Sequence, residues 1–133
     1  MSDWNTGIIE EFRANQGKVA EFEGFTVILM HHLGAKSGIE RVNPLVCYPM
    51  SDDEFAVIAS NGGAATNPDW YYNLKAYPKI TVELGTAVFA VAARELEGRE
   101  RETVWARALN PQLGEAQQRT TRTFPILLLT RIP

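Results

Sequence analysis

The sequence predicts an antiparallel β-sheet or small β-barrel with short flanking helices, and three observations lead to this prediction. About six short apolar runs divide the chain, and most of them are separated only by short turns. Three or four stretches follow helical periodicity instead, and each is short. Strands and helices do not alternate as a doubly wound parallel sheet requires. With 133 residues and no sign of a linker or repeat, the chain is expected to form one domain over residues 1–133.

The first expected element is an amphipathic helix over residues 4–15. Trp4, Ile8 and Phe12 recur at helical spacing and share one face, while the opposite face is charged. Gly17 follows the last periodic residue and offers an end signal. We expect the apolar face of this helix to pack on the sheet.

The strands are predicted from apolar runs bounded by glycine, proline and aspartate. They are expected at residues 25–30, 42–49, 54–59, 80–84, 86–96 and 125–130. A turn at 52–53 joins the second and third strands, and a tight turn at Gly85 joins the fourth and fifth. Sequential strands with such short turns form an antiparallel meander.

The remaining helices are expected at residues 70–76, 99–109 and from 111 to about 120. Asn67 can cap the first of them, and Pro68 fits its first turn because proline lacks the N–H that a helix start leaves unpaired. These helices lie between strands and flank the sheet.

Two polar loops suggest a site for an anionic, phosphorylated ligand. In residues 34–41, Lys36 and Arg41 supply fixed charge beside a glycine-rich turn whose N–H groups can converge on an anion. In the second loop, Gly62 and Gly63 would allow the backbone to approach a flat ligand closely. Either loop could also be an ordinary surface turn.

Other kinds of site are disfavoured. The net charge of −3 argues against general nucleic-acid binding. His31 and His32 are adjacent and would point to opposite faces of a strand, so no metal site is expected. The single cysteine, Cys47, reads as a small buried hydrophobe. The chain has no run typical of a membrane span or signal peptide, so a cytoplasmic location is expected.

The chain closely resembles the deazaflavin-dependent nitroreductase family, whose enzymes use coenzyme F420. The resemblance is carried, in chain order, by residues 4–15, 36–38 with Arg41, 44–45, 59–63, 68–76 and 118–125. It implies a split β-barrel of the FMN-binding or flavin-reductase type with short flanking helices. It also implies an oxidoreductase that transfers a hydride from the reduced deazaflavin to a quinone, a nitro compound or a conjugated enone or lactone.

The resemblance also implies which residues hold the cofactor. Lys36, Ser37 and Arg41 would bind its phosphate and acidic tail, and the second polar loop would contact the ring. The full expected set is Lys36, Ser37, Gly38, Arg41, Pro44, Leu45, Val46, Ala59, Ser60, Asn61, Gly62, Gly63, Trp70 and Asn73.

Two departures from the family pattern bear on the site. Ala35 stands where relatives carry a basic residue before the lysine, so one phosphate contact is missing. Leu113 and Ala116 occupy the stretch where many relatives have tyrosine beside the substrate. Ser60 and Tyr48 are then the candidate catalytic side chains, as proton donors beside water.

Several alternatives remain open from the sequence. The same fold could bind FMN, or the protein could bind a deazaflavin or another small molecule without catalysing a reaction. Homodimers are expected for barrels of this kind. The amphipathic helix at 4–15 also allows peripheral contact with the inner membrane.

Overall fold

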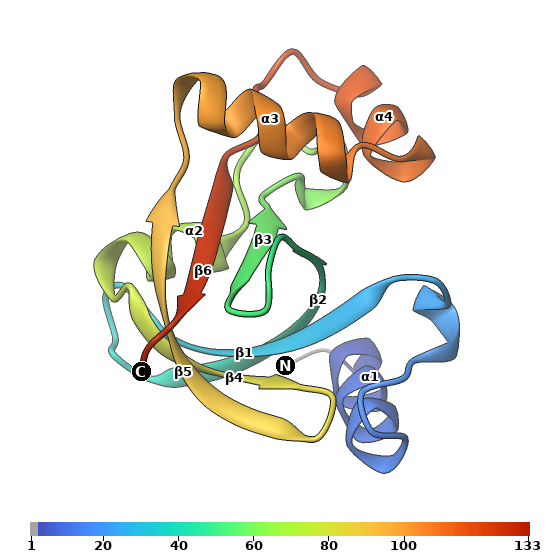
Figure 1. Ribbon diagram of the computed structural model, residues 1–133, viewed down its shortest axis with the longest axis vertical. Helices are drawn as coiled ribbons and strands as arrows, with labels where there is room; N and C mark the ends of the chain where they lie inside the picture. Colours follow the sequence, from blue (N-terminus) through green and yellow to red (C-terminus); the bar gives the residue numbers. More distant parts are fainter. Residues whose placement is uncertain (1–2) are drawn as a thin grey trace.

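The computed structural model describes residues 3–133 and contains a closed, six-stranded antiparallel barrel (Figure 1). The strands are β1 (Thr26–Leu33), β2 (Glu40–Pro49), β3 (Glu54–Ile58), β4 (Lys79–Leu84), β5 (Ala87–Glu95) and β6 (Ile126–Arg131). Their order around the barrel is β1-β2-β3-β6-β5-β4, which closes through the pairing of β1 with β4. The prediction of a small antiparallel barrel is confirmed.

The sequence of β6 is a continuous apolar run over 126–129 because both faces of the strand are buried there. Leu127 and Leu129 face the barrel interior, where they pack in the main core cluster. Ile126 and Leu128 face outward into a second cluster beneath two helices. A strand buried on both faces has no position for a polar residue.

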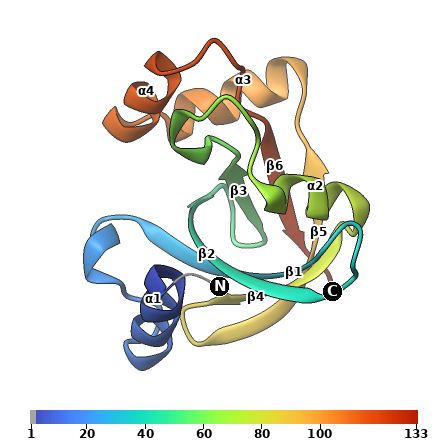
Figure 2. The ribbon, with the colours of Figure 1, turned by 180° about the vertical axis from the view of Figure 1, so that it is seen from behind.

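Four helices surround the barrel: α1 (Asp3–Ala14), α2 (Asp69–Ala76), α3 (Gly98–Ala108) and α4 (Pro111–Gln118). Two short 3-10 turns, η1 (Ala20–Phe22) and η2 (Asn61–Gly63), interrupt the loops. Helix α1 lies at one end of the molecule, and α3 and α4 lie together at the other (Figures 1 and 2).

Helix α1 is held to the barrel by the apolar face that its spacing predicted. Ile8, Ile9 and Phe12 are buried and share a cluster with Val27 and Leu29 of β1. Burying three such side chains contributes roughly 1.5–3 kcal/mol each before entropy is counted.

The structure differs from the sequence prediction at two places. Strand β1 continues through both histidines to Leu33, which pairs with Glu40, so the turn between the strands is shorter than expected. The capping role predicted for Asn67 is wrong, because Pro68 occupies the N-cap position of α2 and no side chain caps it. Asn67 accepts a hydrogen bond from Arg122 instead.

Candidate cofactor site

Two adjoining cavities form one groove between β2 and the loop after β3. The Arg41 cavity, of about 850 Å³, is lined by residues that include Arg41 and Asn43. The Leu45 cavity, of about 640 Å³, is lined by residues that include Leu45. Both are lined by Asn61, Pro68 and Trp70. A molecule longer than either cavity could therefore occupy both.

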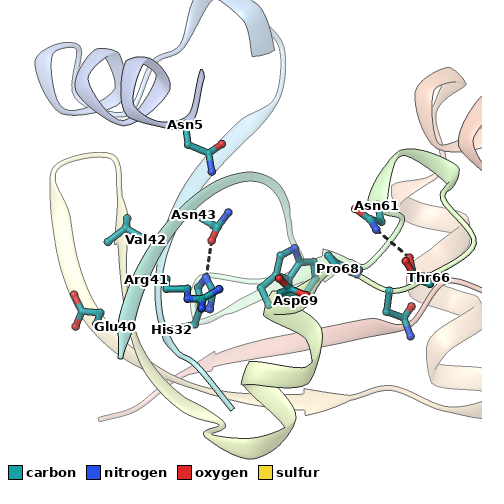
Figure 3. A pocket seen from close by; sticks show the side chains of 12 residues that line it. Asn5, His32, Glu40, Arg41, Val42, Asn43, Asn61, Thr66, Pro68 and Asp69 are labelled. Carbon is teal, nitrogen blue, oxygen red and sulfur yellow. Dashed lines mark hydrogen bonds between the residues drawn. The ribbon is translucent and has the colours of Figure 1, made fainter. Parts of the chain in front are cut away.

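The Arg41 cavity is polar, and Figure 3 shows side chains from several elements around it. Asn5 comes from α1, Arg41 and Asn43 come from β2, and Asn61 comes from η2. Arg41 is exposed, so its guanidinium can meet a ligand without first leaving a buried partner. The charged residues of the lining are Arg41, Glu40 and Asp69, so Arg41 is the cation in this lining that can bind a carboxylate or phosphate, beside neutral amide donors.

A buried hydrogen-bonded chain fixes the floor of the Arg41 cavity. Asn43 Oδ1 lies 2.6 Å from His32 Nε2, and Asn73 Nδ2 lies 2.9 Å from His32 Nδ1. With Nε2 donating and Nδ1 accepting, a neutral imidazole satisfies both contacts. Burial lowers the pKa of His32, which favours that neutral form. Asn73 Oδ1 also accepts from the Ala35 N–H at 2.8 Å, so the chain anchors the β1–β2 turn.

The lining of the Leu45 cavity is more apolar than that of the Arg41 cavity. Its base is formed by three consecutive residues of β2, Pro44, Leu45 and Val46. Across from them, the lining includes Gly62 of η2 and Leu113 of α4. The lining also includes Glu21, Glu115 and Arg119, so the apolar surface that suits a planar ring system adjoins charged groups.

The far end of the Leu45 cavity is lined by residues from before β1. Trp4 and Phe22 line it and pack edge to face, with ring centroids 6.2 Å apart. The Trp4 indole N–H donates to Glu21 Oε1 at 3.4 Å. Trp4, which was predicted only to pack the N-terminal helix on the sheet, therefore also lines the groove.

The loop that follows β3 is held by an arginine whose role sequence reasoning missed. Arg122 donates to the carbonyl oxygens of Ala59 at 3.1 Å, Ser60 at 2.9 Å and Ala64 at 3.1 Å. It also donates to the side chain of Asn67. One guanidinium thus fixes a loop of nine residues, and the only sequence signal was its position in the resembling segment at 118–125.

The same loop packs tightly against α4. Asn61, Gly62 and Gly63 all have positive φ, at 48°, 64° and 86°. A side chain at Gly63 would place its Cβ 2.6 Å from the carbonyl oxygen of Ala116. Arg119 donates to the Gly62 carbonyl at 3.1 Å. Gly63 therefore allows η2 and α4 to approach closely enough to form one edge of the groove.

The predicted cofactor residues fall into three groups in the structure. Those that line the groove are Arg41, Pro44, Leu45, Val46, Ser60, Asn61, Gly62 and Trp70. Those behind its wall are the buried Ala59, Gly63 and Asn73. Those in the exposed β1–β2 turn are Lys36, Ser37 and Gly38, next in the chain to the Glu40 and Arg41 end of the groove.

The two candidate catalytic residues both line the Leu45 cavity. Tyr48 accepts a hydrogen bond from the Asn110 amide at 3.2 Å, and burial raises the pKa of its phenol. The phenol is therefore protonated at neutral pH and can donate. Cys47 does not line the groove as described; burial raises the pKa of its thiol to about 12, so it is inert.

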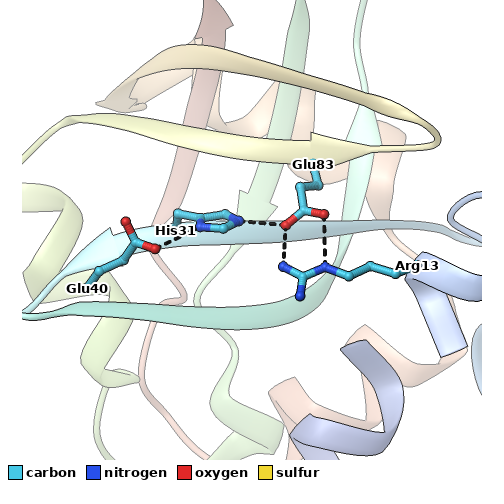
Figure 4. Close-up of polar contacts among 4 residues, drawn as sticks. All are labelled: Arg13, His31, Glu40 and Glu83. Atoms are coloured by element: carbon cyan, nitrogen blue, oxygen red, sulfur yellow. Dashed lines mark hydrogen bonds and ion pairs between the residues drawn. The ribbon is translucent and has the colours of Figure 1, made fainter. Parts of the chain in front are cut away.

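A second polar network lies on the outside of the barrel (Figure 4). His31 lies 3.0 Å from a Glu40 oxygen through Nδ1 and 2.6 Å from a Glu83 oxygen through Nε2. Glu83 also accepts two hydrogen bonds from Arg13, at 3.2 and 2.7 Å. These contacts join α1, β1, β2 and β4 at one point. Burial opposes charge on His31, but the two carboxylates outweigh it and raise the pKa of His31.

Replacing His31 with glutamine is expected to destabilise the fold more at about pH 5.5 than at about pH 8.5. The folded state holds the imidazole proton more tightly than the unfolded chain, in which the pKa of a histidine is about 6.5. This stabilisation is fully present below about pH 6.5 and is lost as the pH rises through the folded pKa. Urea unfolding of the wild-type protein and of His31→Gln between about pH 5.5 and 8.5 tests this prediction. Glu40→Gln keeps the ring and should weaken the pH dependence; an equal cost of His31→Gln at both pH values would contradict the assignment.

Within residues 3–133, no cluster of three or more histidine, cysteine, aspartate or glutamate side chains has a geometry suited to a metal ion. None of the helices described is both long and apolar enough to cross a membrane.

Comparison with known proteins gives consistent matches. The family model for F420H(2)-dependent quinone reductase matches residues 5–131. An F420H(2)-dependent quinone reductase of Mycobacterium tuberculosis is 32% identical over 110 residues, covering 78% of this chain and 72% of its own. A second, putative F420H(2)-dependent quinone reductase of that species is 32% identical over 104 residues, covering 77% and 87%.

Two solved structures are similar in fold and sequence. An F420-H2-dependent reductase, FDR-A, has a TM-score of 0.70 and 39% identity, covering 77% of this chain and 92% of its own. A structure described as a domain-swapped dimer has a TM-score of 0.70 and 35% identity, covering 96% and 97%. These matches confirm the split barrel and the F420-dependent type that the sequence resemblance implied.

Proposed function

The chain belongs to the F420H(2)-dependent quinone reductase family, and from this premise we propose that its groove binds coenzyme F420 and positions it beside a quinone. The protein is an oxidoreductase whose cofactor is F420. The finer assignments are proposals: which residues hold the cofactor, where the acceptor lies and which group supplies a proton.

The residues of the groove fit the two chemically different parts of the cofactor. Its acidic, phosphate-bearing tail needs positive charge and donors, which Arg41, Asn43 and Asn61 offer in the Arg41 cavity. Its flat ring needs an apolar slot, which Pro44, Leu45 and Val46 line in the Leu45 cavity. The observation that carries the proposal is that the two cavities adjoin, with Asn61, Pro68 and Trp70 lining both.

The protein's contribution to the reaction is position, exclusion of water and a proton. When bound, reduced F420 supplies a hydride. The loop anchored by Arg122 holds Gly62 against the ring slot, where the lack of a side chain allows close contact. Tyr48 is our first candidate for the proton donor, because its phenol stays protonated and lines the same cavity. Ser60 is the second candidate, since it also lines this cavity.

Titration of the purified protein with oxidised F420, followed by its fluorescence, tests the cofactor directly. FMN is titrated in parallel, because related split barrels could bind it. Saturable quenching by the deazaflavin and a weaker response to FMN are expected. Tighter binding of FMN would contradict the assignment of the groove.

Lys36→Ala is expected to weaken F420 binding about tenfold or more while leaving the free energy of unfolding nearly unchanged. Lys36 is exposed in the turn that precedes Arg41 in the chain, so its loss should remove a charge-assisted contact with the ligand but little packing. Lys79→Ala removes an equally exposed lysine from β4 and serves as the control. Equal affinities of the two variants for F420 would show that Lys36 does not bind the cofactor.

The association of the protein with itself and with membranes stays at the level of prediction. A homodimer is supported by the similar structure described as a domain-swapped dimer. The molar mass in solution, compared with 14.8 kDa for one chain, tests it. For membrane contact, α1 offers Trp4, which is 49% exposed, whereas Ile8 and Phe12 are buried against the barrel. Co-sedimentation with anionic vesicles would detect peripheral binding.

A further inference from the structure

Helix α4 is capped by the side chain of Asn110. Asn110 Oδ1 accepts hydrogen bonds from the backbone N–H groups of Gln112 at 3.0 Å and Leu113 at 3.1 Å, and a proline follows as the first helical residue. Neither α2 nor α3 has a side chain at its N-cap that makes such a bond. The start of α4 is therefore fixed by one side chain.

The capping contacts also fix which end of the Asn110 amide is the oxygen. A backbone N–H can only donate, so the atom that faces Gln112 and Leu113 must be the acceptor. Nδ2 then points the other way, where it donates to the Ala108 carbonyl oxygen at 3.1 Å and to the Tyr48 oxygen at 3.2 Å. A carbonyl oxygen can only accept, so the contact with Ala108 independently gives the same orientation.

This orientation sets the direction of the hydrogen bond to Tyr48. The Asn110 nitrogen has only hydrogens to offer, so the Tyr48 oxygen must accept, and Asn110 does not hold the phenolic proton. Tyr48 is on β2, lines the Leu45 cavity and packs against the apolar cluster beneath α4. Its proton is therefore available to a group in that cavity.

We propose that Asn110 is a positioning residue for proton transfer, because its amide holds the Tyr48 oxygen and leaves the phenolic proton to the quinone in the Leu45 cavity. The inference rests on the proposed function, which gives Tyr48 as the first candidate for the proton donor. Reduction of a quinone to a hydroquinone takes up two electrons and two protons. A hydride carries both electrons and one of the protons, and Tyr48 supplies the other to the quinone oxygen.

Asn110 also stabilises the phenolate that remains after the proton has left, until water returns a proton to it. A hydrogen bond donated to the charged form favours that form. Burial raises the pKa of Tyr48, and the contact with Asn110 opposes this rise. The other titratable or charged groups near Tyr48 are Cys47, which follows the same strand, and the cavity residues Glu21, Glu115 and Arg119. None of these groups changes in a variant of Asn110.

Asn110→Asp separates the positioning role from the capping role. Aspartate caps a helix about as well as asparagine, so the start of α4 is kept. A carboxylate oxygen now faces Tyr48 and can only accept, so it captures the phenolic proton. We expect kcat with F420H2 and a quinone to fall about tenfold or more, and the Kd for F420 to stay within about twofold. A fall in affinity equal to the fall in kcat would indicate a merely structural role and overturn the proposal.

Tyr48→Phe supplies the matched background for this variant. The new carboxylate would also repel the Ala108 carbonyl, and this effect is the same whether residue 48 is tyrosine or phenylalanine. Tyr48→Phe alone should lower kcat about tenfold or more, and adding Asn110→Asp to it should change kcat by less than about twofold. Equal falls in both backgrounds, or full kcat in Tyr48→Phe, would overturn the proposal. Failure of the wild-type protein to bind F420 would instead contradict the proposed function.

NMR titration of protein labelled at the tyrosine Cζ atoms tests the contact without cofactor or turnover. The Tyr48 signal is the one that Tyr48→Phe lacks. The pKa of Tyr48 should be higher in Asn110→Ser, which can cap α4 but is too short to reach the phenol, and higher still in Asn110→Asp. The other tyrosines should titrate as in the wild-type protein. An unchanged pKa of Tyr48 in both variants would overturn the positioning role of Asn110, whatever the kinetics.

Discussion

Arg122→Ala is expected to weaken F420 binding about a hundredfold and to lower the free energy of unfolding by about 3 kcal/mol. The guanidinium donates to the carbonyl oxygens of Ala59, Ser60 and Ala64, and its centre lies 4.9 Å from the centroid of the Phe124 ring. Truncation removes the guanidinium donor from the Ala59 and Ala64 carbonyl oxygens, while the Ser60 carbonyl keeps the Gly63 N–H at 2.9 Å. The loop then loses the shape that presents its glycines to the ring slot.

Arg119 provides the matched control for this prediction. It comes from the same segment and reaches the same loop, but it is exposed and donates only to the Gly62 carbonyl. Arg119→Ala should cost about 1 kcal/mol or less. Urea unfolding gives the stabilities and fluorescence titration gives the affinities. Equal losses in the two variants would mean that the network around Arg122 does not shape the site.

The strands could be predicted from the sequence because burial leaves a local signal. The run at 126–129 is apolar without interruption, as a strand buried on both faces must be. The turn at Gly85 could also be predicted, because the φ of Gly85, 59°, is one that glycine adopts without strain. Closure of the barrel could not be predicted from local patterns, since β1 and β4 pair across some fifty residues.

The site was only partly accessible from the sequence for the same reason. Leu45 and Gly62 were named from motifs, and both line the groove. Phe22 carried no motif that marked it, and it lines the groove through the fold of the segment before β1. Arg122 acts through contacts 55 to 63 residues away, which no local pattern can reveal.

The wrong prediction for Asn67 has a physical explanation of the same kind. Asparagine before proline is a good local signal for a helix N-cap. Its side chain has one strong acceptor oxygen, however, and the Arg122 guanidinium takes it. A charged donor competes successfully with a backbone N–H, because charge-assisted hydrogen bonds are about twice as strong as neutral ones.

Gly63→Ala is expected to lower the free energy of unfolding by about 3 kcal/mol, compared with about 1 kcal/mol for Gly62→Ala. Both residues have positive φ, so alanine is strained by a similar amount at either position. They differ in their surroundings. A Cβ at 62 meets nothing within 4 Å, whereas a Cβ at 63 would lie 2.6 Å from the Ala116 carbonyl oxygen and 2.9 Å from the Arg119 Cβ.

The difference between these two variants isolates the contact between η2 and α4 from backbone strain. Because Ala116 Cβ belongs to a buried cluster under α4, the helix cannot yield at 63 without disturbing that packing. Gly63→Ala should therefore lower kcat as well as the free energy of unfolding, because a displaced α4 widens the Leu45 cavity. Urea unfolding and steady-state kinetics with F420H2 measure both effects. If the two alanine variants were equally stable, the close approach of η2 and α4 would not shape this edge of the groove.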